Sequence, residues 1–337
     1  MNREELGWDP FFEEHFSQYK DQGFSPARIA LEERNLYVAY SEMGELTGKV
    51  SGRFRHNTRA RGDFPAVGDW VVVKGNPDTQ KMTIHHVLPR KSKFSRKVVT
   101  TDGRITEEQV VSANIDTVFL VIALDEDFNM RRIERYLTIV QESGARLVIV
   151  LNKMDLCENV YDRIKEVKSI TTGVPIHAVS ALKKVGLEQL DTYLSVGQTV
   201  TLVGSSGVGK STLVNSILGI ERQEVGPVRE KDGKGRHITV KRELIVLPQG
   251  GMFIDNPGMR TISLWGGEGL DETFEDIVYL ATQCKFRDCQ HRTEPGCAIR
   301  QAIEDGTLDE NRYENYLKLQ KELKILSVRK DQRARVR

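Results

Sequence analysis

Residues 204–212 read GSSGVGKST and match the pattern G-x-x-x-x-G-K-[ST]. Its glycines let backbone N–H groups curl around phosphate oxygens, Lys210 adds a positive charge for the β- and γ-phosphates, and Ser211 offers an oxygen to Mg²⁺. The apolar stretch TVTLVG precedes this segment and STLVNSIL follows it, which predicts a strand before and a helix after, the context that a phosphate-binding loop requires. The predicted loop residues are Gly204, Ser205, Ser206, Gly207, Val208, Gly209, Lys210, Ser211 and Thr212.

A second segment, FIDNPG at 253–258, suits the γ-phosphate side of a nucleotide site. Asp255 can hold Mg²⁺ through a water molecule, and the N–H group of Gly258 can meet the γ-phosphate. Taken alone, Asp-Asn-Pro-Gly is an ordinary turn. Its position after the phosphate loop and directly past an apolar strand favours the functional interpretation.

The residues that would choose the base lie upstream of the loop. LVIVLNKMD supplies Asn152, Lys153 and Asp155, and HAVSAL supplies Ser180 and Ala181. The Asp155 carboxylate can accept hydrogen bonds from guanine N1–H and the 2-amino group, donors that adenine does not present there, so guanine is the predicted base and an ATPase is disfavoured. Alone, Asn-Lys-x-Asp could equally be a helix cap, and Ser-Ala carries no information.

Strands and amphipathic helices alternate from about residue 114, which predicts a parallel sheet with helices on both faces. Because the base-reading segments come first and the phosphate segments follow, the usual strand neighbours of a GTPase require a circular permutation. Upstream of this region, DWVVVK and MTIHHVLP are short β-rich runs, and the turn sequences RGDFPAVGD and GNPD interrupt the segment that contains them. This pattern is typical of a small all-β barrel. The predicted organisation is an acidic extension at 1–35, a small β-barrel at 36–105, whose OB-fold and RNA-binding character are implied by the family resemblance described below, a circularly permuted P-loop GTPase domain at 106–268, and a helical, zinc-binding domain at 269–337.

Four side chains near the C-terminal end follow C-x4-C-x-H-x5-C: Cys284, Cys289, His291 and Cys297. Three thiolates and one imidazole make a closed tetrahedral set suited to one structural Zn²⁺ ion, although the spacing differs from paired C-x2-C fingers. A disulfide framework is the alternative, and it is disfavoured in a chain with no export signal. Cys157 stands apart and is interpreted as an ordinary small side chain.

The net charge of the 337-residue chain is only +1, but its distribution is uneven. Residues 48–100 hold 12 Lys and Arg against 3 Asp and Glu, and residues 312–337 hold 9 against 3, whereas residues 1–47 hold 4 against 10. Basic side chains near Phe54, Phe64 and Phe94 favour a nucleic acid as partner over a merely solvated face. The acidic start and the lack of a long apolar run predict a cytoplasmic protein with no membrane association.

The order of these motifs resembles the circularly permuted GTPases, in detail the bacterial ribosome small subunit-dependent GTPase A family. AVGDWVVV, LPRKSKFSRK, NKMD, GSSGVGKSTLVN, GRHITV, DNPGMR and the Cys/His cluster occur in that family's order. The resemblance covers nearly the whole chain, residues 1–35 least. It implies an oligonucleotide-binding barrel, a permuted GTPase domain and a zinc domain, with Mg²⁺ bound alongside GTP or GDP. It also implies a monomer that binds the small ribosomal subunit and its rRNA and hydrolyses GTP during late assembly of that subunit.

The resemblance also bears on how hydrolysis occurs. Many GTPases orient the attacking water with a glutamine after the Asp-x-x-Gly glycine, but Met259 stands there and cannot do so. His237 is the candidate substitute, because a neutral imidazole can orient a water molecule and accept its proton; a packing histidine is the alternative. Thr239 falls on the position for Mg²⁺ and γ-phosphate sensing, although Ile238 and Val240 depart from the threonine-rich run of the family. A GTP-sensing RNA-binding chaperone with negligible hydrolysis is the competing function.

Overall fold

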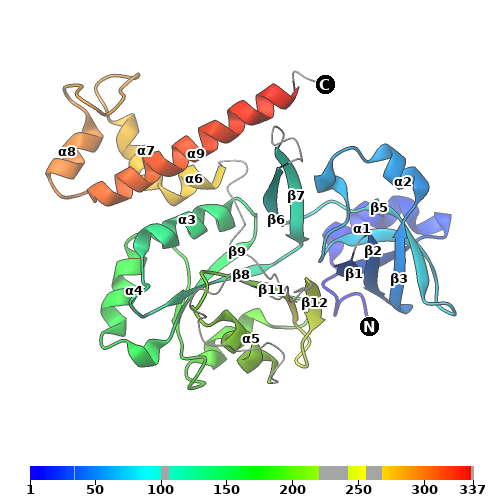
Figure 1. Cartoon of the computed structure of the whole chain (residues 1–337). Helices are drawn as coiled ribbons and strands as arrows, with labels where there is room; N and C mark the ends of the chain where they lie inside the picture. Colours follow the sequence, from blue (N-terminus) through cyan, green and yellow to red (C-terminus); the bar gives the residue numbers. More distant parts are fainter. Residues whose placement is uncertain (34, 100–105, 220–241, 256–267, 335–337) are drawn as a thin grey trace, which may run out of the picture. The chain divides into compact units, whose positions relative to one another are not determined.

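The chain forms two compact units in a computed structural model (Figure 1). One unit spans Met1–Val98, Glu107–Phe128 and Ser143–Ile262, and the other spans Val99–Thr106, Asn129–Glu142 and Ser263–Arg337. The structure describes residues 1–33, 35–99, 106–219, 242–255 and 268–334. Within those residues, no helix is both long enough and apolar enough to cross a lipid bilayer.

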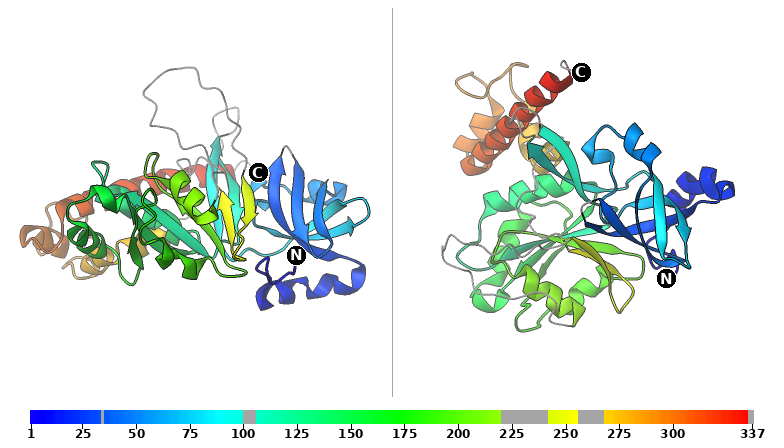
Figure 2. Two further views of the ribbon diagram at one scale, coloured as in Figure 1. Left: turned by 90° about the horizontal axis from the view of Figure 1, so that it is seen from below. Right: turned by 45° about the vertical axis from the view of Figure 1, so that its right-hand side comes forward.

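Five strands close into a barrel, as the sequence predicts (Figure 2). Their order is β1-β2-β3-β5-β4, and β4 pairs back to β1. Only β3 and β5 run parallel, so the strands follow the Greek-key closure of an OB-fold. The interior is apolar and includes Ala27, Ile29, Tyr37, Val71 and Ile84. The strands are β1 (Ser25–Glu33), β2 (Leu36–Ser41), β3 (Gly44–Val50), β4 (Trp70–Asn76) and β5 (Lys81–Val87), with α2 (Gly52–Asn57) and the 3₁₀ turn η2 (Arg61–Asp63) between β3 and β4.

The first 24 residues pack on this barrel through aromatic rings. Helix α1 (Pro10–Phe16) and the 3₁₀ helix η1 (Ser17–Gln22) precede β1, and the Trp8 ring meets Trp70 of β4 edge-on at 4.7 Å. The barrel strand β1 itself lies within the stretch assigned to the extension, before the expected boundary at residue 36. Strand β1 is buried without alternation because both of its faces are covered: Ala27 and Ile29 lie in the barrel core, and Arg28 on the other face contacts Leu6 and Asn114. This pattern hides its strand character in the sequence.

A second group of strands forms the GTPase sheet, in the order β10-β9-β8-β11-β13-β12. The strands from β10 to β13 are parallel, as predicted, whereas β12 is antiparallel to β13. The short link at 247–251 forces this reversal, because a parallel crossover needs about a dozen residues or more. The strands are β8 (Thr117–Ala123), β9 (Arg146–Asn152), β10 (Ile176–Ala178), β11 (Thr199–Val203), β12 (Glu243–Val246) and β13 (Met252–Asp255).

The remaining elements of this unit connect those strands. Strands β6 (Lys93–Val99) and β7 (Thr106–Ala113) pair as a separate ribbon between the barrel and β8 in the sequence. The helical connections are η3 (Met154–Leu156), α4 (Val160–Lys168), η4 (Leu187–Tyr193) and α5 (Lys210–Leu218). The core of the sheet contains Phe119, Val148, Val150, Leu213 and Phe253.

The second unit is helical and is held by a buried charged cluster. Glu134 of α3 is only 2% exposed, and its carboxylate accepts hydrogen bonds from Arg312 and Asn315 of α9. Burial raises the pKa of Glu134, and the two donors oppose that rise. Helix α3 therefore packs with the C-terminal helices, although its residues lie in the range 106–268 predicted as the GTPase domain. The helices are α3 (Met130–Gln141), α6 (Glu268–Thr273), α7 (Glu275–Thr282), α8 (Ala298–Glu304) and α9 (Glu310–Ala334).

A buried arginine reinforces the connection that β1 and β12 make between the barrel and the GTPase sheet. Arg28 of β1 is 2% exposed and donates hydrogen bonds to the carbonyl oxygens of Leu6, Gly68 and Asn114. Its Nη1 also lies 3.4 Å from the sulfur of Met252 in β13. Burial lowers the pKa of Arg28 to about 10, with Asp116 and Asp69 opposing the decrease. The guanidinium thus ties together the N-terminal segment, the barrel and the strand that ends at Asp255.

We predict that Arg28→Met lowers the free energy of unfolding by about 3 kcal/mol, because the carbonyl groups of Leu6 and Asn114 lose the guanidinium donor and that of Gly68 keeps only the Asn114 amide. The measurement is the midpoint of urea unfolding, compared with the exposed control Arg59→Met. Equal midpoints for the two variants would contradict this role of Arg28.

Candidate nucleotide site and cysteine cluster

The predicted phosphate loop connects β11 to α5, in the expected strand–loop–helix arrangement (Figure 1). Two of its glycines are required by their surroundings. Gly204 has a φ of 148°, and a Cβ there would lie 2.3 Å from the carbonyl oxygen of Val121. Gly209 has a φ of 94°, and a Cβ there would lie 2.3 Å from Nδ2 of Asn152. Any larger residue at either position would push the loop away from the strands that hold it.

Asn152 connects the upstream and downstream segments. Its side chain, at the end of β9, is 2% exposed. Nδ2 donates to the carbonyl oxygen of Val208 in the phosphate loop at 2.8 Å, and Oδ1 accepts from the N–H group of Ala181 at 3.0 Å. One amide therefore fixes the loop and the Ser180–Ala181 turn to the same strand end.

The Ser180–Ala181 turn is also held from α5. Ser216 Oγ donates to the carbonyl oxygen of Ala181 at 3.1 Å. Ser180 is 1% exposed, and its Oγ accepts from the N–H group of Lys183. The segments predicted to read the base and to bind the phosphates, which are separated in the sequence, thus form one connected edge of the sheet.

Lys153 and Asp155 follow Asn152 in a tight turn. Lys153 has a left-handed backbone with a φ of 62°, and Asp155 lies exposed in the 3₁₀ turn η3. Within the described part of the chain, no hydrogen bond to the Asp155 carboxylate is present. The carboxylate predicted to read the base is accordingly accessible.

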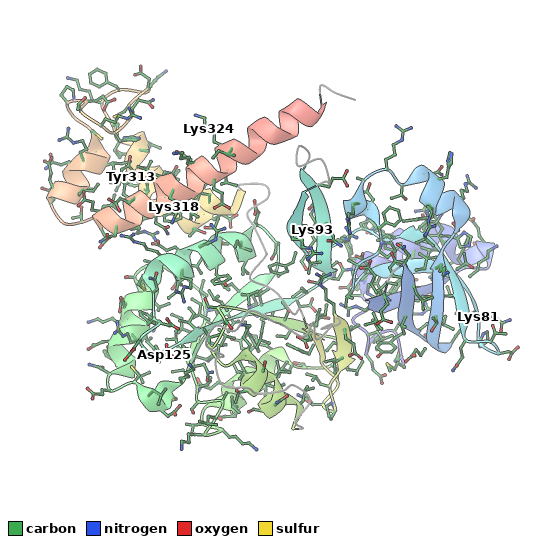
Figure 3. The ribbon with its side chains drawn as sticks, in the orientation of Figure 1. Lys81, Lys93, Asp125, Tyr313, Lys318 and Lys324 are labelled. Atoms are coloured by element: carbon green, nitrogen blue, oxygen red, sulfur yellow. The ribbon has the colours of Figure 1, made fainter. Side chains whose placement is uncertain are left out.

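An aspartate that the sequence analysis missed is paired with Lys153. Nζ of Lys153 lies 2.7 Å from Oδ2 of Asp125, which follows β8 by two residues (labelled in Figure 3). Burial raises the pKa of Asp125, but the hydrogen bonds from Lys153 and from the N–H group of Asp127 outweigh it and the pKa falls. A carboxylate directly after a buried parallel strand was the available signal, since such strand ends form ligand sites.

The phosphate-side residues occupy the same edge of the sheet. Lys210 donates to the carbonyl oxygens of Gly204, at 2.9 Å, and Ser205. Asp255 is the last residue of β13, which pairs in parallel with β11. It therefore lies at the same edge of the sheet as the predicted phosphate loop, which follows β11. His237, Thr239, Gly258 and Met259 lie outside the described residues.

A hollow of about 900 Å³ lies next to this edge. Asp125, Leu156, Cys157, Asp162 and Arg163 are among its lining residues. Its lining includes neither Asp155 nor any residue of the predicted phosphate loop.

The predicted metal ligands converge in the helical unit. The ligand atoms of Cys284, Cys289, His291 and Cys297 all lie within 4.8 Å of one another. Nδ1 of His291 is 3.5 Å from the sulfur of Cys284 and 3.4 Å from that of Cys297, and these two sulfurs are 4.0 Å apart. Four atoms at tetrahedral bond lengths of about 2.1–2.3 Å around one ion would be separated by about 3.4–3.8 Å.

The pKa values of two thiols in the cluster shift in opposite directions. Burial raises the pKa of Cys289 to about 11. Burial also acts to raise the pKa of Cys284, but the N–H groups of Ala298 and Ile299 and the neighbouring thiols outweigh it, so that pKa falls. Neighbouring thiolates repel one another, and a bound metal ion removes that cost. The group could therefore hold a metal ion.

Fold and site together define a circularly permuted P-loop GTPase that carries an OB-type barrel and a Cys₃His group. The RsgA GTPase family model matches residues 87–265. The chain belongs to the RsgA GTPase family and is a GTP hydrolase.

Curated relatives and solved structures agree with this assignment. The protein of Opitutus terrae named small ribosomal subunit biogenesis GTPase RsgA is 45% identical, over 98% of this chain and 92% of that protein. The protein of the same name from Syntrophotalea carbinolica is 42% identical, over 100% and 93%. The crystal structure of YjeQ from Thermotoga maritima aligns with a TM-score of 0.64 and 29% identity, covering 89% of this chain and 98% of that one. YloQ, titled a circularly permuted GTPase, has a TM-score of 0.63 and 24% identity, covers 89% of this chain and 95% of that one, and supports the fold.

We predict that Asn152→Ala lowers the free energy of unfolding by about 2 kcal/mol, because the buried carbonyl of Val208 and the N–H group of Ala181 both lose their partner. GDP affinity should fall as well, measured by titration of a fluorescent GDP analogue. Asn57→Ala, an exposed amide at the end of α2, is the control. Equal stability and GDP affinity in the two variants would show that the Asn152 bridge contributes nothing.

Proposed function

We propose that this GTPase acts in the maturation of the small ribosomal subunit, binding the subunit and hydrolysing GTP to GDP and phosphate in response to it. One observation supports the nucleotide half of the proposal above all others: Asn152 bonds the phosphate loop and the Ser180–Ala181 turn at once. The ribosomal half rests on the relatives, which are named for biogenesis of the small ribosomal subunit.

The nucleotide would lie along the edge where these segments meet. The Asp155 carboxylate would accept hydrogen bonds from the N1–H and the 2-amino group of guanine, with Lys153 and the Ser180–Ala181 turn beside the base. Residues 204–212 would surround the phosphates, with Lys210 as their cation. Gly258 would meet the γ-phosphate from the other side.

Magnesium and hydrolysis involve the same edge. Ser211 and Asp255 supply the oxygen donors that Mg²⁺ prefers, with Thr239 as a third, and the bound ion would neutralise charge on the β- and γ-phosphates. Lys210 stabilises the charge that develops on the transferred group. His237 orients the attacking water in place of the absent glutamine, and Thr239 senses the γ-phosphate.

We assign structural Zn²⁺ to Cys284, Cys289, His291 and Cys297. The thiolate-rich donor set supports this choice of metal, as do the separations of 3.4–4.0 Å among the ligand atoms of Cys284, His291 and Cys297, with all four ligand atoms within 4.8 Å of one another. All four positions are filled by protein, so the ion would hold the irregular segment between α7 and α8 and would offer no open position to a substrate.

The barrel and the basic C-terminal segment are the proposed contacts to rRNA. Residues 48–100 hold 12 Lys and Arg against 3 Asp and Glu, which suits a polyanion. Arg53, Arg55 and Arg59 are exposed in or beside α2. We expect the protein to act in the cytoplasm as a monomer. One chain would then bind one small ribosomal subunit.

The test is GTP turnover by the purified protein, alone and with small subunits, large subunits or naked RNA, with Lys210→Ala as the blank. We predict that small subunits alone raise the rate at least tenfold and that the blank abolishes the increase, since a positioned water and the loop lysine are both required. Tight GTP-dependent subunit binding without stimulation would favour the nucleotide-gated chaperone instead.

A further inference from the structure

The ion pair between Lys153 and Asp125 fixes a side chain next to the residue assigned to the base. Lys153 stands between Asn152, which fixes the phosphate loop, and Asp155, the residue assigned to the base. Its left-handed backbone sets the direction in which its side chain leaves the turn. The 2.7 Å contact with Asp125 then fixes the far end of that side chain.

The Asp125 carboxylate is itself held in place. Its other oxygen, Oδ1, accepts from the N–H group of Asp127 at 3.0 Å. The preceding residue is fixed to the same strand end as Lys153, because the N–H group of Leu124 donates to the carbonyl oxygen of Asn152 at 2.8 Å. The carboxylate thus approaches Lys153 from a rigid neighbouring strand.

We propose that Asp125 is a positioning residue for guanine recognition: it holds the Lys153 ammonium so that the aliphatic stem is presented to the base and Asp155 stays accessible. The lysine stem is an apolar surface about four carbons long, suited to contact with a flat ring, and fixing it in advance removes an entropic cost of binding. Without Asp125, the nearest acidic residue along the turn is Asp155, two positions on. A pair between Lys153 and Asp155 would occupy the carboxylate that must accept the guanine donors.

This inference rests on the proposed assignment of Lys153 and Asp155 to the base. It predicts two effects on nucleotide binding that a purely structural role of Asp125 would not produce. Loss of the Asp125 charge should weaken binding only through Lys153, and it should reduce the preference for guanine over hypoxanthine, which lacks the 2-amino group that Asp155 would bind.

The experiment is a double-mutant cycle with GDP and IDP as probes. Asp125→Asn, Lys153→Met and the double variant are titrated in the full-length protein, with Asp127→Asn as the matched control from the same turn. Asp127 is exposed and contributes only its backbone N–H group to Asp125. Thermal melting of each variant shows whether the fold is intact.

We predict that Asp125→Asn weakens GDP binding about fivefold and narrows the ratio of IDP to GDP dissociation constants at least twofold, whereas Asp127→Asn changes neither. In the Lys153→Met background, Asp125→Asn should add less than a twofold effect. Additive losses, or an unchanged affinity and ratio in Asp125→Asn, would overturn the role of Asp125. Because these titrations use no ribosomes, a failure of subunit stimulation would count against the proposed function alone.

Discussion

The buried amide of Asn152 is the constraint on which the nucleotide site depends. A permuted chain must bring together base-reading segments and a phosphate loop that are encoded in reverse of the usual order. The parallel sheet places their strand ends at one edge, but strand pairing alone does not fix the loops that follow. The two hydrogen bonds of Asn152 supply that fixation, and a buried amide that lost one of them would be left with an unpaired polar group. Gly209 is confined for the same reason, since a Cβ there would lie 2.3 Å from Asn152 Nδ2.

A buried arginine organises the unit that contains this site, and a buried carboxylate organises the helical unit. The barrel and the GTPase sheet are continuous through the pairing of β1 with β12, and Arg28 adds hydrogen bonds to carbonyl groups from the N-terminal segment, the barrel and the segment before β8. In the helical unit, Glu134 and Arg312 join α3 to α9, and Arg312 also bonds Asp276 and lies over the Phe274 ring. Each of these groups would be costly to bury alone, and each is surrounded by partners.

The sequence predicted the elements with strong local signals and missed those set by distant contacts. The phosphate loop, the strands β8, β9 and β11, and the Cys₃His group were all predictable, because glycine spacing, apolar runs and ligand type are local properties. Strand β1 was not recognised, since both of its faces are buried and the alternation that marks a strand is absent. The reversal of β12 was missed as well, because alternating strands and helices suggested parallel pairing throughout. Asp125 was overlooked because its partner Lys153 is 28 positions away, and no spacing rule links two charges across neighbouring strands.

The central claim is that a residue upstream of the phosphate loop chooses the base of the nucleotide whose phosphates the loop holds. The most direct measurement is the affinity of Asp155→Asn for GDP and for xanthosine diphosphate, whose C2 carbonyl replaces the 2-amino group of guanine. A carboxylate accepts from the amino group, whereas an amide can donate to the carbonyl, so the account predicts that the variant loses GDP affinity and gains affinity for the xanthine nucleotide. An unchanged base preference would show that Asp155 does not contact the base and would contradict the account.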